Sequence, residues 1–191
     1  MDQSTGAVAG PDGQLRCPWA LGTEDMLAYH DGEWGRPVRE DRGLFEKLCL
    51  EAFQSGLSWL TILRKRENFR AAFAGFEMTK VAAFGPADVD RLLADAGIVR
   101  NRAKIEAAIA NAGAALGLPD GLADLVWKYA EPGRPAPRAL GDVPASTPAA
   151  KALSADLRRH GFRFTGPVTA YATMQACGLV NDHLADCFSR G

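Results

Sequence analysis

The chain has 191 residues, of which 47% are apolar and 24% are charged, as is usual for a soluble globular protein. Its net charge of −1 argues against a protein that coats DNA through many phosphate contacts, but allows an enzyme with one basic face. No run approaches the roughly 18 apolar residues of a membrane span. Residues 1–15 lack the pattern of a secretory signal, so we expect a flexible leader, a single domain over residues 16–191 and a cytoplasmic location.

Amphipathic helical patterns dominate the first half of the chain, and no convincing alternating strand pattern interrupts them. Apolar residues between Leu44 and Ala52 share one helical face, and Asp41 stands where a cap would precede them. Ser58 is placed to cap the next helix, which reads SWLTILRKRENFRAAF. Thr79 is expected to open a short helix.

The middle of the chain predicts a helical hairpin. Pro86 suits the first turn of the helix PADVDRLLADAG, and Gly97 is expected to end it as a left-handed cap. The helix NRAKIEAAIANAGAAL follows after only a few residues, as in a hairpin. DGLADLVWKYA predicts another helix, capped by Asp120.

The last third begins with the loop-rich connector EPGRPAPRALGDVPASTP, in which Pro and Gly prevent regular structure. Pro148, preceded by Ser146 and Thr147, is expected to start a helix. A final helical region is expected from about Pro167 to Cys187. The predicted fold class is therefore all-α.

Four side chains of the kind that bind zinc lie near the two ends of the chain. His183 and Cys187 are four residues apart, so on a helix they would share a face and could hold one ion. Cys17 and His30 would complete a closed tetrahedral set, the arrangement of a structural zinc site. The alternative is a surface thiol with ordinary polar histidines. The other two cysteines are interpreted as small buried hydrophobes: Cys49 and Cys177.

A carboxylate near the first predicted helical face is a candidate functional group. Glu51 borders the apolar face, so it either pairs with Lys47 or faces a cleft. Aromatic residues crowd the same part of the sequence: Trp19, Tyr29, Trp34 and Trp59. They could form ordinary core, or a pocket that stacks a flat ligand and contacts its polar edge through the acid. A cationic ring would gain further from the aromatic faces.

Basic residues form three short runs, which are either solvated helix faces or contacts to nucleic acid: residues 64–70, 100–104 and 158–159. The turn around Gly97, with Arg100 and Lys104, is the most suggestive of the three. A helical hairpin presents backbone N–H groups and a helix start, both suited to a phosphate oxygen.

Several longer strings resemble the bacterial 3-methyladenine DNA glycosylase I family, a divergent branch of the helix-hairpin-helix glycosylases. The matching text is AYHDGEWG, LFEKLCLEAFQSGLSWLTILRKRENFRAAF, DAGIVRNRAKIEAAIANA and MQACGLVNDH. The resemblance extends from about Arg16 to Cys187, in order and without a large insertion. It implies a two-lobed helical fold with the base pocket in the cleft between the lobes.

The resemblance also implies roles for individual residues. Glu51 matches the glutamate that contacts the base, and Trp59 matches the stacking tryptophan. Met26 stands where well-known members carry a tyrosine, which puts base affinity or selectivity in doubt. Further aromatic positions of the pocket region match Tyr29, Trp19 and Trp34. The ligands of a bound structural zinc match Cys17, His30, His183 and Cys187.

The implied activity is hydrolysis of the N-glycosidic bond of 3-methyladenine in double-stranded DNA, by a monomer that leaves an abasic site. The nucleotide must be flipped out of the duplex, and Leu57 either wedges into the gap or belongs to the core. The alternative is a zinc-stabilised helical DNA-binding protein without catalysis. A zinc hydrolase fits less well, because four protein ligands leave no open position for water.

Overall fold

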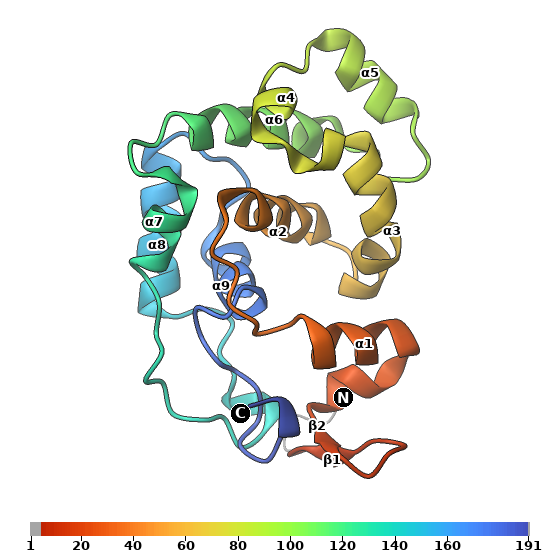
Figure 1. Cartoon of the computed structure of the whole chain (residues 1–191), viewed down its shortest axis with the longest axis vertical. Helices are drawn as coiled ribbons and strands as arrows, with labels where there is room; N and C mark the ends of the chain where they lie inside the picture. The colour runs from red at the N-terminus through yellow and green to blue at the C-terminus, as the bar shows by residue number, and fades with distance from the viewer. Residues whose placement is uncertain (1–4, 191) are drawn as a thin grey trace.

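The computed structural model describes residues 5–190, and within this range nine α-helices carry most of the fold, as the predicted all-α class requires. In chain order they are α1 (Glu24–Gly32), α2 (Asp41–Gln54), α3 (Trp59–Ala72), α4 (Met78–Ala82), α5 (Pro86–Ala94), α6 (Arg102–Leu116), α7 (Gly121–Trp127), α8 (Pro148–Arg159) and α9 (Pro167–Ala176). Helices α4, α5 and α6 lie at one end of the molecule, and α1 lies toward the other (Figure 1). None of the described helices combines the length and the apolar character needed to cross a membrane.

Helix α2 occupies the centre of the fold and packs against α3, α6, α7 and α9. Most of its side chains are buried, among them Phe45 and Phe53. Phe53 packs against Phe69 of α3, with their ring centroids 4.7 Å apart. Because α2 is enclosed by other helices, any polar side chain on it is removed from water unless a cavity reaches it.

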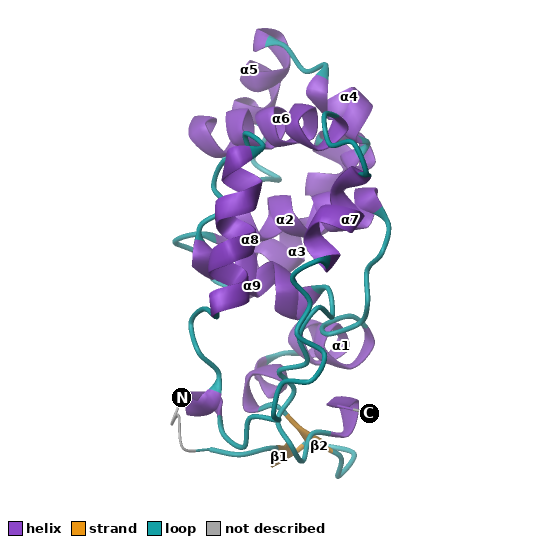
Figure 2. Ribbon diagram, turned by 90° about the vertical axis from the view of Figure 1, so that its left-hand side faces the viewer, coloured by secondary structure: helices purple, strands orange, loops and turns teal. Residues whose placement is uncertain are grey.

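A short β-hairpin replaces part of the flexible leader expected from the sequence (Figure 2). Strand β1 (Val8–Ala9) pairs antiparallel with β2 (Leu15–Arg16). The Arg16 guanidinium donates to Asp12 within the hairpin at 2.6 Å and to Asp31 of α1 at 2.9 Å, which ties the hairpin to the domain. Residues 1–4 of that leader lie outside the described residues.

Local capping signals account for several helix starts. The Ser58 hydroxyl accepts a hydrogen bond from the Thr61 backbone N–H at 3.2 Å, as predicted for α3. Thr147 caps α8 in the same way, and Pro148 occupies the first turn. Helix α1, which the sequence analysis did not predict, has Thr23 as its cap.

At two predicted helix boundaries, the residue expected to cap the helix does not cap it. Gly97 does not adopt a left-handed conformation; a side chain there would instead collide with Asn68 and with Asp95, whose Oδ1 would lie 2.9 Å from a Cβ. Asp120 makes no capping hydrogen bond to α7. The carboxylate of Asp41, from the start of α2, accepts from the Ala123 N–H of α7 at 2.7 Å instead.

The last predicted helix was too long. Helix α9 ends at Ala176, and Gly178 follows with a φ of 73°. A side chain at Gly178 would also meet the backbone carbonyl of Gly35 at 2.7 Å, so only glycine fits this close approach. The chain beyond it, including His183 and Cys187, runs as an irregular loop back toward the N-terminal segment (Figure 1).

Candidate functional site

A cavity of about 270 Å³ lies where α1 meets α2, α3 and α9. Helix α1 contributes Met26 and Tyr29, and α2 contributes Glu51. Helix α3 contributes Trp59 from its first turn, directly after the Ser58 cap. The structure thus brings to one cavity residues that the sequence analysis selected from three separate helices.

Two further tryptophans complete the aromatic lining. Trp19 and Trp34 both line the cavity, and their ring centroids lie 5.0 Å apart in a T-shaped arrangement. The rings of Tyr29 and Trp59, which also line the cavity, are tilted at 43°, with centroids 5.1 Å apart. Aromatic faces of this kind stack flat rings, at about 1–3 kcal/mol for each base they contact.

Glu51 is the acidic group of the cavity. Only 7% of its surface is exposed, and burial raises the pKa of its carboxyl group to about 8, an effect that nearby Lys47 partly opposes. Lys47 does not form an ion pair with Glu51: its ammonium lies 3.4 Å from Glu33 Oε2 and over the Tyr29 ring. Of the two sequence interpretations, the acid that faces a cleft is the one found.

Two other polar atoms at the cavity are buried without a hydrogen-bond partner among the described residues: the Tyr29 hydroxyl and the Trp59 indole Nε1. Burial also raises the pKa of Tyr29 well above its ordinary value, with the Glu51 charge as the next cause, so the hydroxyl remains a donor. Folded proteins pair nearly all buried polar atoms. Two unpaired donors thus belong to residues that line the same cavity as Glu51, as expected of a site for a flat, polar ligand.

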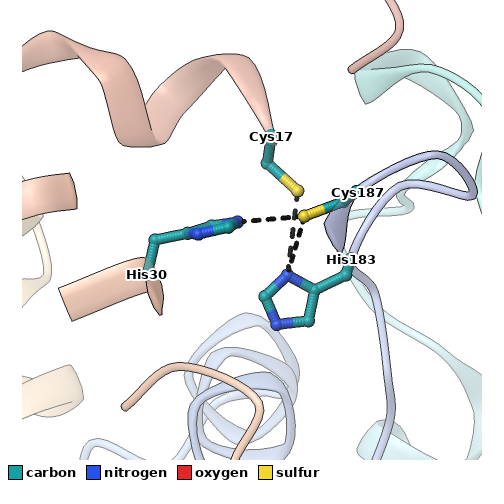
Figure 3. A group of neighbouring side chains, drawn as sticks. All are labelled: Cys17, His30, His183 and Cys187. Atoms are coloured by element: carbon teal, nitrogen blue, oxygen red, sulfur yellow. Dashed lines mark hydrogen bonds between the residues drawn. The ribbon is translucent and has the colours of Figure 1, made fainter. Parts of the chain in front are cut away.

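The second cluster consists of Cys17, His30, His183 and Cys187, whose side chains converge in Figure 3. All four are buried, and their ligand atoms lie within 4.8 Å of one another. Cys187 Sγ lies 3.4 Å from His30 Nε2 and 3.6 Å from His183 Nδ1. Tetrahedral coordination with the usual Zn–S and Zn–N bond lengths would place ligand atoms about 3.3–3.8 Å apart. The cluster therefore has the composition and spacing of a metal site.

Each histidine of the cluster is oriented by its other ring nitrogen. His30 Nδ1 lies 2.8 Å from Asp31 Oδ1, and His183 Nε2 lies 3.2 Å from the Trp34 carbonyl oxygen. Burial lowers the pKa of both rings, that of His183 to about 4, so the imidazoles are neutral as a metal requires. The same burial raises the pKa of the Cys17 thiol to about 12, so a metal would be needed to deprotonate it.

The predicted contacts to DNA are only partly accessible. Leu57 is 43% exposed, on the turn between α2 and α3, and Arg100 is exposed on the turn between α5 and α6. Lys104 is a correction: it is buried, and its ammonium donates to the carbonyl oxygens of Phe53 and Ser55 at 2.9 and 2.6 Å. Its charge stabilises the C-terminal end of α2 and is not free for a phosphate.

Helix α9 supplies lining residues that the sequence analysis did not single out. Ala172 and Gln175 are three residues apart, so they share a helix face, and that face lines the cavity. Gln54 of α2 lines it as well. The string MQACGLVNDH carries part of the family resemblance, but a glutamine in an otherwise apolar stretch does not by itself indicate a cavity.

The fold and the site together define a class of helical proteins. Its members have an aromatic cavity that contains an acid, and a buried cluster of two cysteines and two histidines. The family of methyladenine glycosylases matches this chain over residues 19–190. The chain belongs to that family.

Named relatives show how close the match is. The DNA-3-methyladenine glycosylase 1 of Escherichia coli is 47% identical over 177 residues, which cover 90% of this chain and 95% of that protein. A DNA-3-methyladenine glycosylase of Haemophilus influenzae is 43% identical, with 90% and 96% covered. The 3-methyladenine DNA glycosylase I of Staphylococcus aureus, solved to study 3-methyladenine recognition, has a TM-score of 0.86 at 38% identity, with 91% and 96% covered.

Proposed function

We propose that this protein is a monofunctional DNA glycosylase that removes 3-methyladenine from alkylated double-stranded DNA and leaves an abasic site. The observation that carries the proposal is the cavity in which the buried acid Glu51 lies among the aromatic side chains of Tyr29 and Trp59, whose polar atoms have no hydrogen-bond partner among the described residues. Relatives at 43–47% identity are named for this activity. The base must be flipped out of the duplex to enter the cavity, at a cost of a few kcal/mol.

Methylation at N3 makes the purine a flat cation with a weak glycosidic bond, so the leaving group needs no protonation. When the bond breaks, its electron pair stays with the base, which leaves as neutral 3-methyladenine. Water supplies the hydroxyl that C1′ of the sugar gains, and the water's second proton is released to solvent. Binding and orientation are therefore the main tasks of the protein.

Glu51 accepts a hydrogen bond from the amino group of the base, while Trp59 and Tyr29 stack on the ring. In the empty cavity a pKa of about 8 leaves the Glu51 carboxyl mostly protonated at neutral pH. A cationic base in front of it favours the ionised form, because opposite charges at short range lower a carboxyl pKa. A neutral, normal base brings no such gain. The Glu51 site thus favours the alkylated purine, with Trp19, Trp34 and Met26 completing the walls.

The cysteine and histidine cluster supports a structural Zn²⁺ held by Cys17, His30, His183 and Cys187. Four protein ligands leave no position for water or substrate, so the ion would serve to tie the N-terminal segment to the C-terminal loop. The DNA contacts proposed are Leu57, as a wedge beside the cavity, and Arg100, at a phosphate. We propose that the protein acts as a monomer in the cytoplasm.

The decisive experiment is a product assay on methylated duplex DNA, with 3-methyladenine and 7-methylguanine measured in the same substrate. We expect free 3-methyladenine in step with abasic sites, and far slower release of 7-methylguanine. Glu51→Gln should slow single-turnover release by about 10- to 100-fold, the usual value of a hydrogen bond to a charged group, with metal content unchanged. Binding of DNA without release of any base would identify a DNA-binding protein instead. Unchanged release by the variant would show that Glu51 is not the base-contacting acid.

A further inference from the structure

The wall of the cavity formed by α9 carries a glutamine whose amide is held in one orientation. Gln175 lies in the last turn of α9 and lines the cavity. Its Nε2 donates to Asp182 Oδ2 at 2.9 Å. A carboxylate only accepts hydrogen bonds, so the NH₂ end of the amide, and not its oxygen, must face Asp182.

Asp182 is itself fixed from the other side. It is 3% exposed, and the Tyr171 hydroxyl of α9 donates to the same Oδ2 atom. The Arg134 guanidinium donates to the Tyr171 oxygen and lies 3.7 Å from Asp182 Oδ1. Oδ2 of Asp182 therefore accepts from both Tyr171 and Gln175, while Oδ1 is buried without a hydrogen bond among the described residues. If the amide of Gln175 turned over, its oxygen would face this carboxylate and the bond to Oδ2 would be lost.

The remaining amide atom, Gln175 Oε1, receives no hydrogen bond within the described part of the chain. Gln175 and Glu51 both line the cavity, so this oxygen is the acceptor that the Gln175 side chain offers to a ligand there. We propose that Gln175 is a specificity-determining residue whose Oε1 accepts a hydrogen bond from the exocyclic amino group of an alkylated adenine, and that Asp182 is the positioning residue that keeps Oε1 facing the base. The inference rests on the proposed function, because it presumes an alkylated purine in the cavity.

The chemistry of the two purines explains the selectivity that this arrangement gives. Adenine carries at C6 an amino group with two N–H donors, which can serve both Glu51 and Gln175. Guanine carries an oxygen at C6, and this oxygen would face Gln175 Oε1, an acceptor that has no proton to donate. A polar atom removed from water without a partner is costly. A fixed acceptor at Gln175 therefore selects 3-methyladenine over 3-methylguanine, although both bear the same methyl group and charge.

The test is single-turnover excision of 3-methyladenine and 3-methylguanine from the same methylated DNA by Gln175→Met. Methionine keeps the length of the side chain and removes the acceptor. We expect 3-methyladenine release to fall about tenfold, the value of one hydrogen bond, with 3-methylguanine release unchanged or faster, so that the ratio of the rates falls at least tenfold. Gln14→Met, on an exposed residue of the hairpin, is the matched control and should leave both rates unchanged. An unchanged ratio in the Gln175 variant would overturn the inference.

Asp182→Ala tests the positioning role. Without Asp182 the amide of Gln175 is free to turn, so the ratio of the 3-methyladenine rate to the 3-methylguanine rate should fall. Asp182→Ala should lower this ratio no further in the Gln175→Met background, because both substitutions remove the same hydrogen bond from Gln175 Oε1 to the base. A merely structural role would lower both rates equally and leave the ratio intact. Asp182 precedes His183, so metal content and melting temperature are measured in parallel, and Gln175→Met decides alone if this variant does not fold. If the wild-type protein releases no 3-methyladenine, the proposed function fails; if it does and the ratio is insensitive to Gln175, only this inference fails.

Discussion

At the scale of single residues, Glu51 carries an energetic cost that its place in the cavity explains. Burial raises the pKa of its carboxyl group from 4.5 to about 8. Between these two values the folded protein holds a proton that the unfolded chain has already released. The free energy of unfolding therefore falls as pH rises through this range, and above pH 8 the full cost of an ionised, buried carboxylate is present.

We predict that Glu51→Gln stabilises the ligand-free protein at alkaline pH. The amide has the same shape and cannot ionise, so the gain should be near zero at pH 4.5 and on the order of 3–5 kcal/mol at pH 9. Urea unfolding of both proteins at a series of pH values measures it. A difference that does not depend on pH would show that Glu51 is not held in a strongly desolvated place.

The residue scale also separates Lys104 from Arg100, two basic side chains of one sequence run. Arg100 is exposed on the turn before α6, whereas the Lys104 ammonium donates to two carbonyl oxygens at the end of α2. Burial lowers the pKa of Lys104 as well. A basic run therefore predicts a charged surface only on average; which of its members reaches solvent depends on the helix packed against it.

At the scale of elements, α2 and α7 are joined by a cap that comes from another helix. Asp41 belongs to the first turn of α2, yet its carboxylate accepts from the Ala123 N–H in the first turn of α7. Gly121, with a φ of 85°, admits the carboxylate so closely that a Cβ there would lie 2.7 Å from it. One side chain thus satisfies a free donor of α7 and lies at the positive end of α2.

We predict that Asp41→Ala destabilises the protein by about 1–2 kcal/mol, the usual cost of a lost cap. For a chain of this length, the melting temperature should fall by about 2–8 °C. Asp120→Ala is the matched comparison, because Asp120 immediately precedes α7 but makes no capping bond, and it should change the melting temperature much less. Equal effects of the two substitutions would contradict the assignment of the cap to Asp41.

At the scale of the whole molecule, the metal cluster and the cavity share a wall. The rings of His183 and Trp34 lie 4.6 Å apart, edge to face, and His183 Nε2 contacts the Trp34 carbonyl oxygen. The rings of His30 and Trp19 lie 5.1 Å apart. Residues that could hold a metal ion therefore support two of the aromatic residues that line the cavity. An ion bound there would stabilise both the chain ends and this wall of the cavity.

We predict that a chelator lowers the melting temperature and the rate of base release together. A loss of about 3 kcal/mol would lower the melting temperature by about 6–12 °C. Mass spectrometry of the native protein should find one zinc per chain, and Cys17→Ser should lose it. Cys49→Ala is the control, since Cys49 is buried in the core away from the cluster, and it should keep the metal. Full melting temperature and activity after metal removal would refute a structural role.

Local signals made much of the helical framework predictable. Two helices begin at a side-chain cap and two have a proline in the first turn, and each of these signals depends only on neighbouring residues. The caps are Ser58 and Thr147, and the prolines are Pro86 and Pro148. The resemblance to relatives also indicated which side chains to examine, including Glu51 and the four cluster residues. Short-range chemistry of this kind needs no knowledge of what packs against the helix.

Only the tertiary structure decided the rest. Cys17 and His183 are 166 positions apart, and the loop that carries His183 was expected to be helical. Three further hydrogen bonds connect residues that are distant in sequence or lie in different kinds of structure. They are those of Asp41 with Ala123, of Lys104 with Phe53 and of Gln175 with Asp182. Amino-acid patterns report the periodicity of one segment, whereas the partner of a buried polar group is whatever the packed chain places within about 3 Å of it.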